Sequence, residues 1–306
     1  MLKRFVILLS LQPFILAAFA QDSTSSPTLN TKKLIIVTGA NAAFYTGSFI
    51  ALNKAWYDGY DRTGFHFFDD LPEWNQMDKA GHVWTTYHVS RASKEMWAWT
   101  GLNRKTSAIL GGVSGMVYQS IIEIQDAYSA AWGFSWSDVG ANVTGAGLFV
   151  LQELAGTGQN VVVKMTYWPK KYPSSLVDRR NELFGKSLME RVLKDYNSQT
   201  YWLSANLKSL FPDLNVPSWL NIAGGYGADG MYGGRTNEWV DKEGTRHDYT
   251  DIRRSRKFYF SPDIDLTRIP VRSKVLKKVF FVLNVIKVPA PAVVVETGKG
   301  LKFGIR

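Results

Sequence analysis

The chain has 306 residues, a formal net charge of +10 and no cysteine. Without a thiol it can form no disulfide scaffold, thiolate metal site or cysteine nucleophile. Hydrophobic residues make up 45% of the chain, which excludes wholesale disorder because low hydrophobicity is what keeps a chain unfolded. The length indicates about two domains.

Residues 1–20 have the layout of a secretory signal peptide. Two basic residues precede an apolar run, and Ala18 and Ala20 stand before the expected cleavage point. A short membrane anchor is the alternative, but the apolar run is shorter than the roughly 20 residues that span a bilayer. We expect export to the periplasm and association with the outer membrane. Residues 21–32, rich in Ser, Thr and Pro, are expected to form a flexible leader.

The positive charge lies in the second part of the chain. Residues 1–160 hold 11 basic and 12 acidic residues, a net charge of −1, whereas residues 161–306 hold 25 and 14, a net charge of +11. Export makes nucleic acid an unsuitable partner. We expect the basic part to meet a membrane through anionic lipid headgroups, with an envelope protein as a further possible partner.

Residues 33–168 are predicted to form a helical domain apposed to a membrane. Small residues recur every four positions from Gly39 to Ala55, and later at Gly111 and Gly115. On a helix this spacing lets a partner backbone approach closely. Residues 34–53 carry no charge and could just cross a hydrocarbon core of ~30 Å. We prefer a compact bundle to a protein with several spans, and whether this stretch crosses a bilayer stays open.

Residues 169–306 are predicted to form a basic α+β region. An amphipathic helix is expected over residues 176–196, and a second one over residues 272–287, where lysines surround an apolar face. Short β-like runs are expected at residues 200–207, 219–226, 257–260, 293–297 and 301–305. They are too few for a single-chain outer-membrane barrel. The predicted fold class is α+β, with an N-terminal small-residue-rich helical bundle and a C-terminal amphipathic helix plus short antiparallel strands.

The first candidate site residues lie on one predicted helix. Asp78 and His82 stand at i and i+4, so they share a face, and an aspartate in that position can orient an imidazole. A simple helix pair is the alternative. Lys79 could contact an anion, but it should point away from the face that Asp78 and His82 share.

Further candidate residues lie on the two following helices. Glu123 and Asp126 come directly after an apolar stretch, where burial of a carboxylate is costly unless it is paired. A solvated helix end is the alternative. Asp138 and Asn142 share a face of the next helix, but Ser135 stands three residues before Asp138, and a capping box would make Asp138 structural.

The order of these motifs resembles a known family. The motifs are Asp78-Lys79-Ala80-Gly81-His82, a Gly/Ser-rich apolar helix from Ser107 to Glu123, Gly133-Phe134-Ser135-Trp136-Ser137-Asp138, and Asn142 with Gly145. Over residues 76–150 they are similar to the YfiM-like family of predicted periplasmic lipoproteins of unknown function, and more distantly to VanZ-like membrane proteins. The resemblance implies an envelope location and a helical core, but no established reaction. Two departures limit it: the lipoprotein cysteine is missing, and the basic C-terminal region lies outside the family pattern.

We therefore expect an exported, membrane-associated envelope protein with a structural or interaction role and no cofactor. The alternative is a hydrolase or transferase acting on a phosphorylated or lipid-linked envelope substrate. In that case His82 is the acid/base, Asp78 orients it, and Glu123 or Asp138 positions a water or an ion. A carboxylate–histidine metal site is a third hypothesis, and it requires Asp78, His82, Glu123 and Asp126 to converge.

Overall fold

The computed structural model describes residues 28–53, 57 and 60–306. The predicted signal peptide and most of the leader lie outside the described residues. The predicted α+β class is confirmed, because long helices dominate the first half and an antiparallel sheet the second. The chain divides into a helical unit (residues 1–70, 82–160 and 269–285) and a sheet unit (residues 71–81, 161–268 and 286–306).

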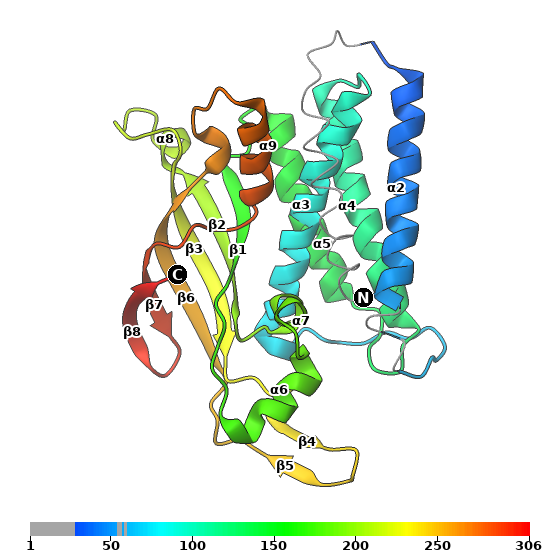
Figure 1. Cartoon of the computed structure of the whole chain (residues 1–306), viewed down its shortest axis with the longest axis vertical. Helices are drawn as coiled ribbons and strands as arrows, with labels where there is room; N and C mark the ends of the chain where they lie inside the picture. Colours follow the sequence, from blue (N-terminus) through cyan, green and yellow to red (C-terminus); the bar gives the residue numbers. More distant parts are fainter. Residues whose placement is uncertain (1–27, 54–56, 58–59) are drawn as a thin grey trace. The chain divides into compact units, whose positions relative to one another are not determined.

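The helical unit is built from long helices that Figure 1 shows as α2, α3, α4 and α5. They span Thr31–Leu52, Met77–Trp99, Arg104–Ala127 and Trp136–Ala155. The first five residues of α3 are grouped with the sheet unit. The short amphipathic helix α9, Lys274–Leu283, also belongs to the helical unit and is shorter than the predicted range.

Local sequence explains where these helices begin and end. Asn103 caps α4 by accepting a hydrogen bond from the backbone of Thr106, and Ser273 caps α9 in the same way. Gly156 ends α5 in the left-handed conformation, with φ of +77°, which glycine adopts without steric cost. The helix boundaries therefore follow from single capping residues.

Glycines allow the helices to pack closely. For α4, the four-residue spacing of Gly111 and Gly115 predicted this close approach. A Cβ built on Gly115 would lie 2.9 Å from the carbonyl oxygen of Thr86 on α3. A Cβ on Gly145 of α5 would lie 2.4 Å from the carbonyl oxygen of Val83. Real Cβ atoms do not approach so closely, so α4 and α5 pack backbone to backbone against α3 only because these positions lack a side chain.

The small-residue stripe predicted along α2 forms little of its buried face. Gly39 and Ala43 are exposed, and among the described members of the stripe Ala51 alone is buried. The other buried side chains are Val37, Asn41, Phe44 and Ser48. The physical reason is an aromatic contact: Phe44 stacks on Tyr118 of α4 with ring centroids 5.2 Å apart. Burial of this large ring outweighs the close approach that small residues would permit. Ala55, the last member of the stripe, lies outside the described residues.

The sheet unit holds six antiparallel strands in the order β1-β2-β3-β6-β7-β8. They span Val161–Tyr167, Gln199–Asn206, Leu220–Asp229, Ser255–Ile264, Pro291–Glu296 and Gly300–Ile305. A two-stranded hairpin, β4 (Glu238–Val240) and β5 (Arg246–Asp248), is inserted between β3 and β6. All five predicted runs are strands, whereas β1 and the hairpin were not predicted.

The helix predicted over residues 176–196 is broken in two. α6 spans Val177–Phe184 and α7 spans Leu188–Lys194. Gly185 ends α6 with φ of +84°, and Ser187 starts α7 through a reciprocal capping box with Glu190. The amphipathic pattern continues through the break, so periodicity alone did not reveal it.

The two faces of the sheet differ in exposure. The buried face holds an apolar cluster of Trp202, Ala223, Tyr259 and Val294. It also holds Lys164 and Asp263, whose Nζ and Oδ2 atoms lie 2.8 Å apart with neither side chain exposed. The exposed face is largely apolar, although Arg256 also lies on it. Its exposed large hydrophobic side chains are Leu203, Phe258, Phe260, Val295, Leu301, Phe303 and Ile305. The register brings them side by side, since Leu203 and Phe260 both pair with Gly224, and Phe260 and Phe303 both pair with Val293.

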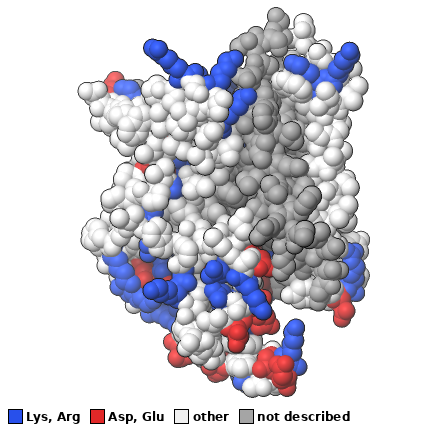
Figure 2. All heavy atoms as spheres, in the orientation of Figure 1, with Lys and Arg blue, Asp and Glu red and all other residues white. Residues whose placement is uncertain are grey.

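The helical unit repeats this distribution. α4 buries Gln119 and Glu123 and exposes Ile109, Val113 and Val117. α2 and α4 are long and apolar enough to cross a membrane by length and composition alone. Figure 2 shows the surface over α2 without charged side chains between its two ends. Between α4 and α5 an apolar groove of about 420 Å³ is lined by residues that include Val113, Val143 and Val150.

Candidate functional site

Three helices of the helical unit each contribute a pair of polar side chains at i and i+4 to one buried cluster. The pairs are His82 and Thr86 on α3, Gln119 and Glu123 on α4, and Asp138 and Asn142 on α5. Side chains at this spacing project from the same face of a helix. The three pairs meet where the glycines bring the helix backbones together.

The amide oxygen of Asn142 is the centre of the hydrogen bonds in this polar cluster. Gln119 Nε2 donates to Asn142 Oδ1 at 3.1 Å, and the hydroxyl of Thr86 lies 2.9 Å from the same oxygen. His82 Nδ1 lies 3.0 Å from this oxygen and 3.0 Å from Gln119 Nε2. Because a buried amide oxygen only accepts hydrogen bonds, these contacts hold the imidazole ring in one orientation.

Two carboxylates lie on either side of the imidazole ring. Glu123 Oε1 is 3.7 Å from Nδ1, and Asp138 Oδ1 is 3.5 Å from Nε2. Both carboxylates are buried, whereas the His82 side chain keeps 12% of its surface exposed. The ring therefore sits at the rim of the cluster, with Nδ1 turned toward Asn142 and Nε2 toward Asp138.

The structure decides the role of Ser135. Its hydroxyl accepts the backbone N–H of Asp138 at 3.1 Å, so it is the N-cap of α5. In a full capping box, the Asp138 carboxylate would accept a hydrogen bond from the backbone N–H of Ser135. That backbone N–H instead donates to Glu123 Oε2 at 3.4 Å. Glu123 thus takes the place of the capping carboxylate, and Asp138 faces His82.

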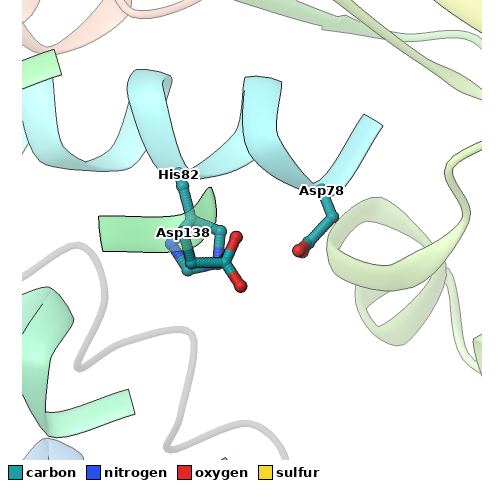
Figure 3. A group of neighbouring side chains, drawn as sticks. All are labelled: Asp78, His82 and Asp138. Atoms are coloured by element: carbon teal, nitrogen blue, oxygen red, sulfur yellow. The ribbon is translucent and has the colours of Figure 1, made fainter. Parts of the chain in front are cut away.

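Asp78 and His82 lie on consecutive turns of α3, and Figure 3 shows both side chains on the same side of that helix, with Asp138 beside His82. Asp78 accepts hydrogen bonds from the hydroxyl of Tyr196 at 2.8 Å and from Lys79 Nζ at 3.0 Å. The expectation that Lys79 points away is wrong. Its flexible chain turns back to Asp78, because a buried ammonium gains from pairing with a carboxylate.

Asp126 lies at the end of α4, and its Oδ1 accepts a hydrogen bond from the hydroxyl of Tyr57 at 2.7 Å. Among the described residues, the structure assembles His82, Glu123, Asp138 and Asn142.

Gln119 and Thr86 were missed by the sequence reasoning. Both are nearly or fully buried, at 2% and 0% exposure, and both bond to Asn142. A usable signal was present, because Gln119 stands four residues before Glu123 and Thr86 four residues after His82. Reading each candidate acid or histidine together with its i±4 neighbour would have found them.

Comparison with known proteins supports the motif pattern. Residues 66–154 match the model of a family described as predicted periplasmic lipoprotein (DUF2279). The matched range contains the entire polar cluster, so the resemblance found from the motifs is confirmed over this part of the chain. It supports an exported, periplasmic protein. No curated protein and no solved structure matches the chain.

Proposed function

We propose that this protein is a membrane-associated component of the cell envelope whose apolar outer surfaces contact lipid and whose polar cluster joins three helices. The observation that carries the proposal is the distribution of polarity in both units. Each buries polar and charged side chains beside its apolar clusters and leaves many large aliphatic and aromatic side chains exposed. The family match, which describes periplasmic proteins, supports the same location.

This distribution of polarity has a physical reason in lipid. A helix of a water-soluble bundle buries its apolar stripe and exposes polar residues. α5 departs from this pattern in part, since Asp138 and Asn142 are buried together with Phe149, while Val143 and Leu151 are exposed. In a hydrocarbon environment polar side chains face the bundle interior and small residues mediate helix contacts. Gly115 and Gly145 supply such contacts here.

The sheet unit supports contact with the outer membrane in particular. Sheet proteins of that membrane turn apolar side chains outward and polar ones inward. Strand β6 alternates partly in this sense, with Phe258 and Phe260 exposed and Ser261 and Asp263 buried, whereas Tyr259 is buried and Arg256 is exposed. Basic residues beside an apolar surface, such as the half-exposed Lys299 and Lys302, suit anionic headgroups.

Membrane fractionation tests this proposal. We expect the exported wild-type protein to stay with the outer membrane after a carbonate wash, and to float with it on a density gradient. Val113→Lys combined with Val143→Lys places two charges in the α4–α5 groove. Each charge is unfavourable by about 3 kcal/mol near a bilayer centre, so this variant should be lost from the membrane fraction.

The control is Thr245→Lys, which adds one such charge, half that of the double variant, to the exposed hairpin turn between β4 and β5. This variant should fractionate like the wild type. Wild-type protein that washes off in carbonate, or a double variant that stays bound, would overturn the proposal.

The enzyme alternative is favoured by one observation. Nε2 of His82 faces the Asp138 carboxylate at 3.5 Å while Nδ1 is held by neutral amides. This is the arrangement of a general acid/base with an orienting partner. A hydrolase or transferase acting on a phosphorylated or lipid-linked substrate would use it. In such an enzyme His82→Gln abolishes turnover without lowering the melting temperature, whereas a structural cluster loses stability.

A further inference from the structure

Strand β8 (Gly300–Ile305) forms one edge of the sheet, and Figure 1 shows it in red beside β7. Every residue of β8 is exposed. Among the described residues, no strand pairs with its outer side. At the opposite edge, the carbonyl of Met165 in β1 accepts the backbone N–H of Lys287. The described part of the sheet unit therefore leaves β8 open along its whole length.

The hydrogen bonds between β7 and β8 show which backbone groups of β8 face this open edge. Arg306 exchanges both backbone hydrogen bonds with Ala290, at 2.8 and 3.0 Å. Hydrogen-bonded and non-hydrogen-bonded pairs alternate along an antiparallel ladder, so the even-numbered residues of β8 bond to β7. The N–H and C=O groups of Leu301, Phe303 and Ile305 therefore point away from β7, toward the open edge.

Little guards these outward groups against another strand. The carbonyl of Ile305 accepts a hydrogen bond from the guanidinium of Arg306 at 3.0 Å, and with two lone pairs it can accept a second. Proteins often protect an open edge with a lysine, because its charge repels an approaching strand. On β8 that residue is Lys302, but its Nζ lies 2.9 Å from Glu296 Oε2 on β7. Its charge is thus balanced within the sheet.

A second copy of β8 fits this edge in one antiparallel register. When Phe303 lies opposite the same residue of the second copy, Leu301 lies opposite Ile305. All three outward residues then form hydrogen-bonded pairs, in which each residue both donates and accepts. A shift of two residues in either direction leaves one outward residue of each copy without a partner in the other β8. The pattern of outward groups is therefore complementary to itself.

The charges of the two copies also fit in this register. Lys302 lies opposite Gly304 of the second copy, so the two lysines do not face each other and the glycine leaves room for the side chain. Arg306 of the second copy lies opposite Gly300, and Gly300 pairs on its other side with Glu296 of β7. A basic residue of one copy thus approaches an acidic residue of the other.

The pairing also shields apolar side chains. Leu301, Phe303 and Ile305 are 60%, 78% and 59% exposed, and they project from the same face of β8 because side chains alternate along a strand. In the paired register each of them gains an apolar neighbour across the new ladder, and the two Phe303 rings lie side by side. Aromatic pairs across strands stabilise a sheet.

We propose that two copies of this protein join through their β8 strands, antiparallel and with Phe303 at the two-fold axis, into one continuous sheet. Each copy offers one fully open edge in its described part, so the pairing closes at two copies instead of continuing as a fibre. The inference goes beyond the proposed function. It depends on the sheet unit alone and is measured in detergent, whether or not the protein binds a membrane.

Cysteine cross-linking of the full chain in detergent tests the register, because the sequence contains no cysteine. Phe303→Cys places two thiols in a hydrogen-bonded pair, whose Cα atoms lie about 5.5 Å apart and within the range of a disulfide. Mild oxidation should convert most of this variant to a covalent dimer. Phe258→Cys is the matched control, since Phe258 is exposed on the same face but lies on β6, two strands from the edge. It should stay uncross-linked, and equal cross-linking of both variants would overturn edge pairing.

A proline substitution tests the role of the backbone. Phe303→Pro removes an outward N–H while the ladder to β7 stays complete, because proline is tolerated on an edge strand where its nitrogen faces solvent. Phe303→Val is the matched control, since it also removes the ring but keeps the N–H. By light scattering in detergent, the wild type and Phe303→Val should have the mass of two chains and Phe303→Pro that of one. A monomeric wild type, or a dimeric Phe303→Pro, would overturn the proposal.

Discussion

Asn142 Oδ1 lies 3.0 Å from Nδ1 of His82, and this contact connects α5 to α3 in the interior of the helical unit. Gln119 donates to the same oxygen from α4 at 3.1 Å. One amide oxygen therefore joins all three helices. Polar groups that are buried together stabilise only as a complete set, because each one left without its partner carries a desolvation penalty.

Asn142→Leu should destabilise the helical unit by about 2–4 kcal/mol. The substitution leaves the buried amide of Gln119 and the hydroxyl of Thr86 without their acceptor. Thermal unfolding in detergent, followed by helical circular dichroism, measures the loss. Thr144→Ala is the control on the same helix, since Thr144 is exposed, and it should change little. Equal stability of the two variants would contradict the central role of Asn142.

Gly145→Ala should lower the stability by about 1–3 kcal/mol, because its Cβ would lie 2.4 Å from the carbonyl oxygen of Val83 and must push α5 away from α3. Gly140→Ala is the control, since a Cβ there meets nothing within 4 Å. Alanine is the better helix former, so that variant should be neutral or gain up to about 1 kcal/mol. The difference between the two melting temperatures is the measured quantity.

Asp263→Leu should destabilise the sheet unit by about 3–5 kcal/mol, because it leaves the fully buried ammonium of Lys164 without its carboxylate. Adding Lys164→Met should restore most of the loss. Glu238→Gln, which breaks the exposed pair with Arg246, should have no measurable effect. Chemical denaturation followed by tryptophan fluorescence compares these variants. Failure of the second substitution to restore stability would show that the pair itself is not the cause.

Acid should weaken the sheet unit through Glu296. Burial raises the pKa of this carboxyl, but hydrogen bonds from Lys299, Lys302 and Ser255 outweigh it and lower the pKa from 4.5 to about 2. A depressed carboxyl pKa stabilises the folded state above pH 4.5, and this contribution is lost as the pH falls through 2. The loss should be about 1–2 kcal/mol, since both lysines are about half exposed and solvent screens them.

The pH dependence of unfolding between pH 5 and about 2 measures this contribution. Glu296→Gln removes the titrating group, so its unfolding free energy should fall less steeply over the same range than that of the wild type. Identical slopes for the two proteins would rule out Glu296 as the source.

Much of the fold could be predicted from the sequence because it depends on local patterns. Capping residues, helical spacing and β-rich runs give the α+β class, α9, and strands β2, β3, β6, β7 and β8 without reference to distant residues. The break at Gly185 and strand β1 escaped prediction. The amphipathic pattern continues across Gly185, so it did not reveal the break. The short apolar run of β1 fits a helix as well as a strand.

The types and spacing of the site residues can be read from the chain alone: paired polar side chains lie at i and i+4 on successive helices, with glycines beside them. Which of these pairs meet depends on how the helices pack. In the folded helical unit, Asp138 faces His82, and the backbone N–H of Ser135 donates to Glu123 instead of Asp138. Helix packing also decides that α2 buries Phe44 rather than Gly39. The reason is that spacing fixes the face a side chain shares within a helix, whereas packing between helices fixes what that face contacts.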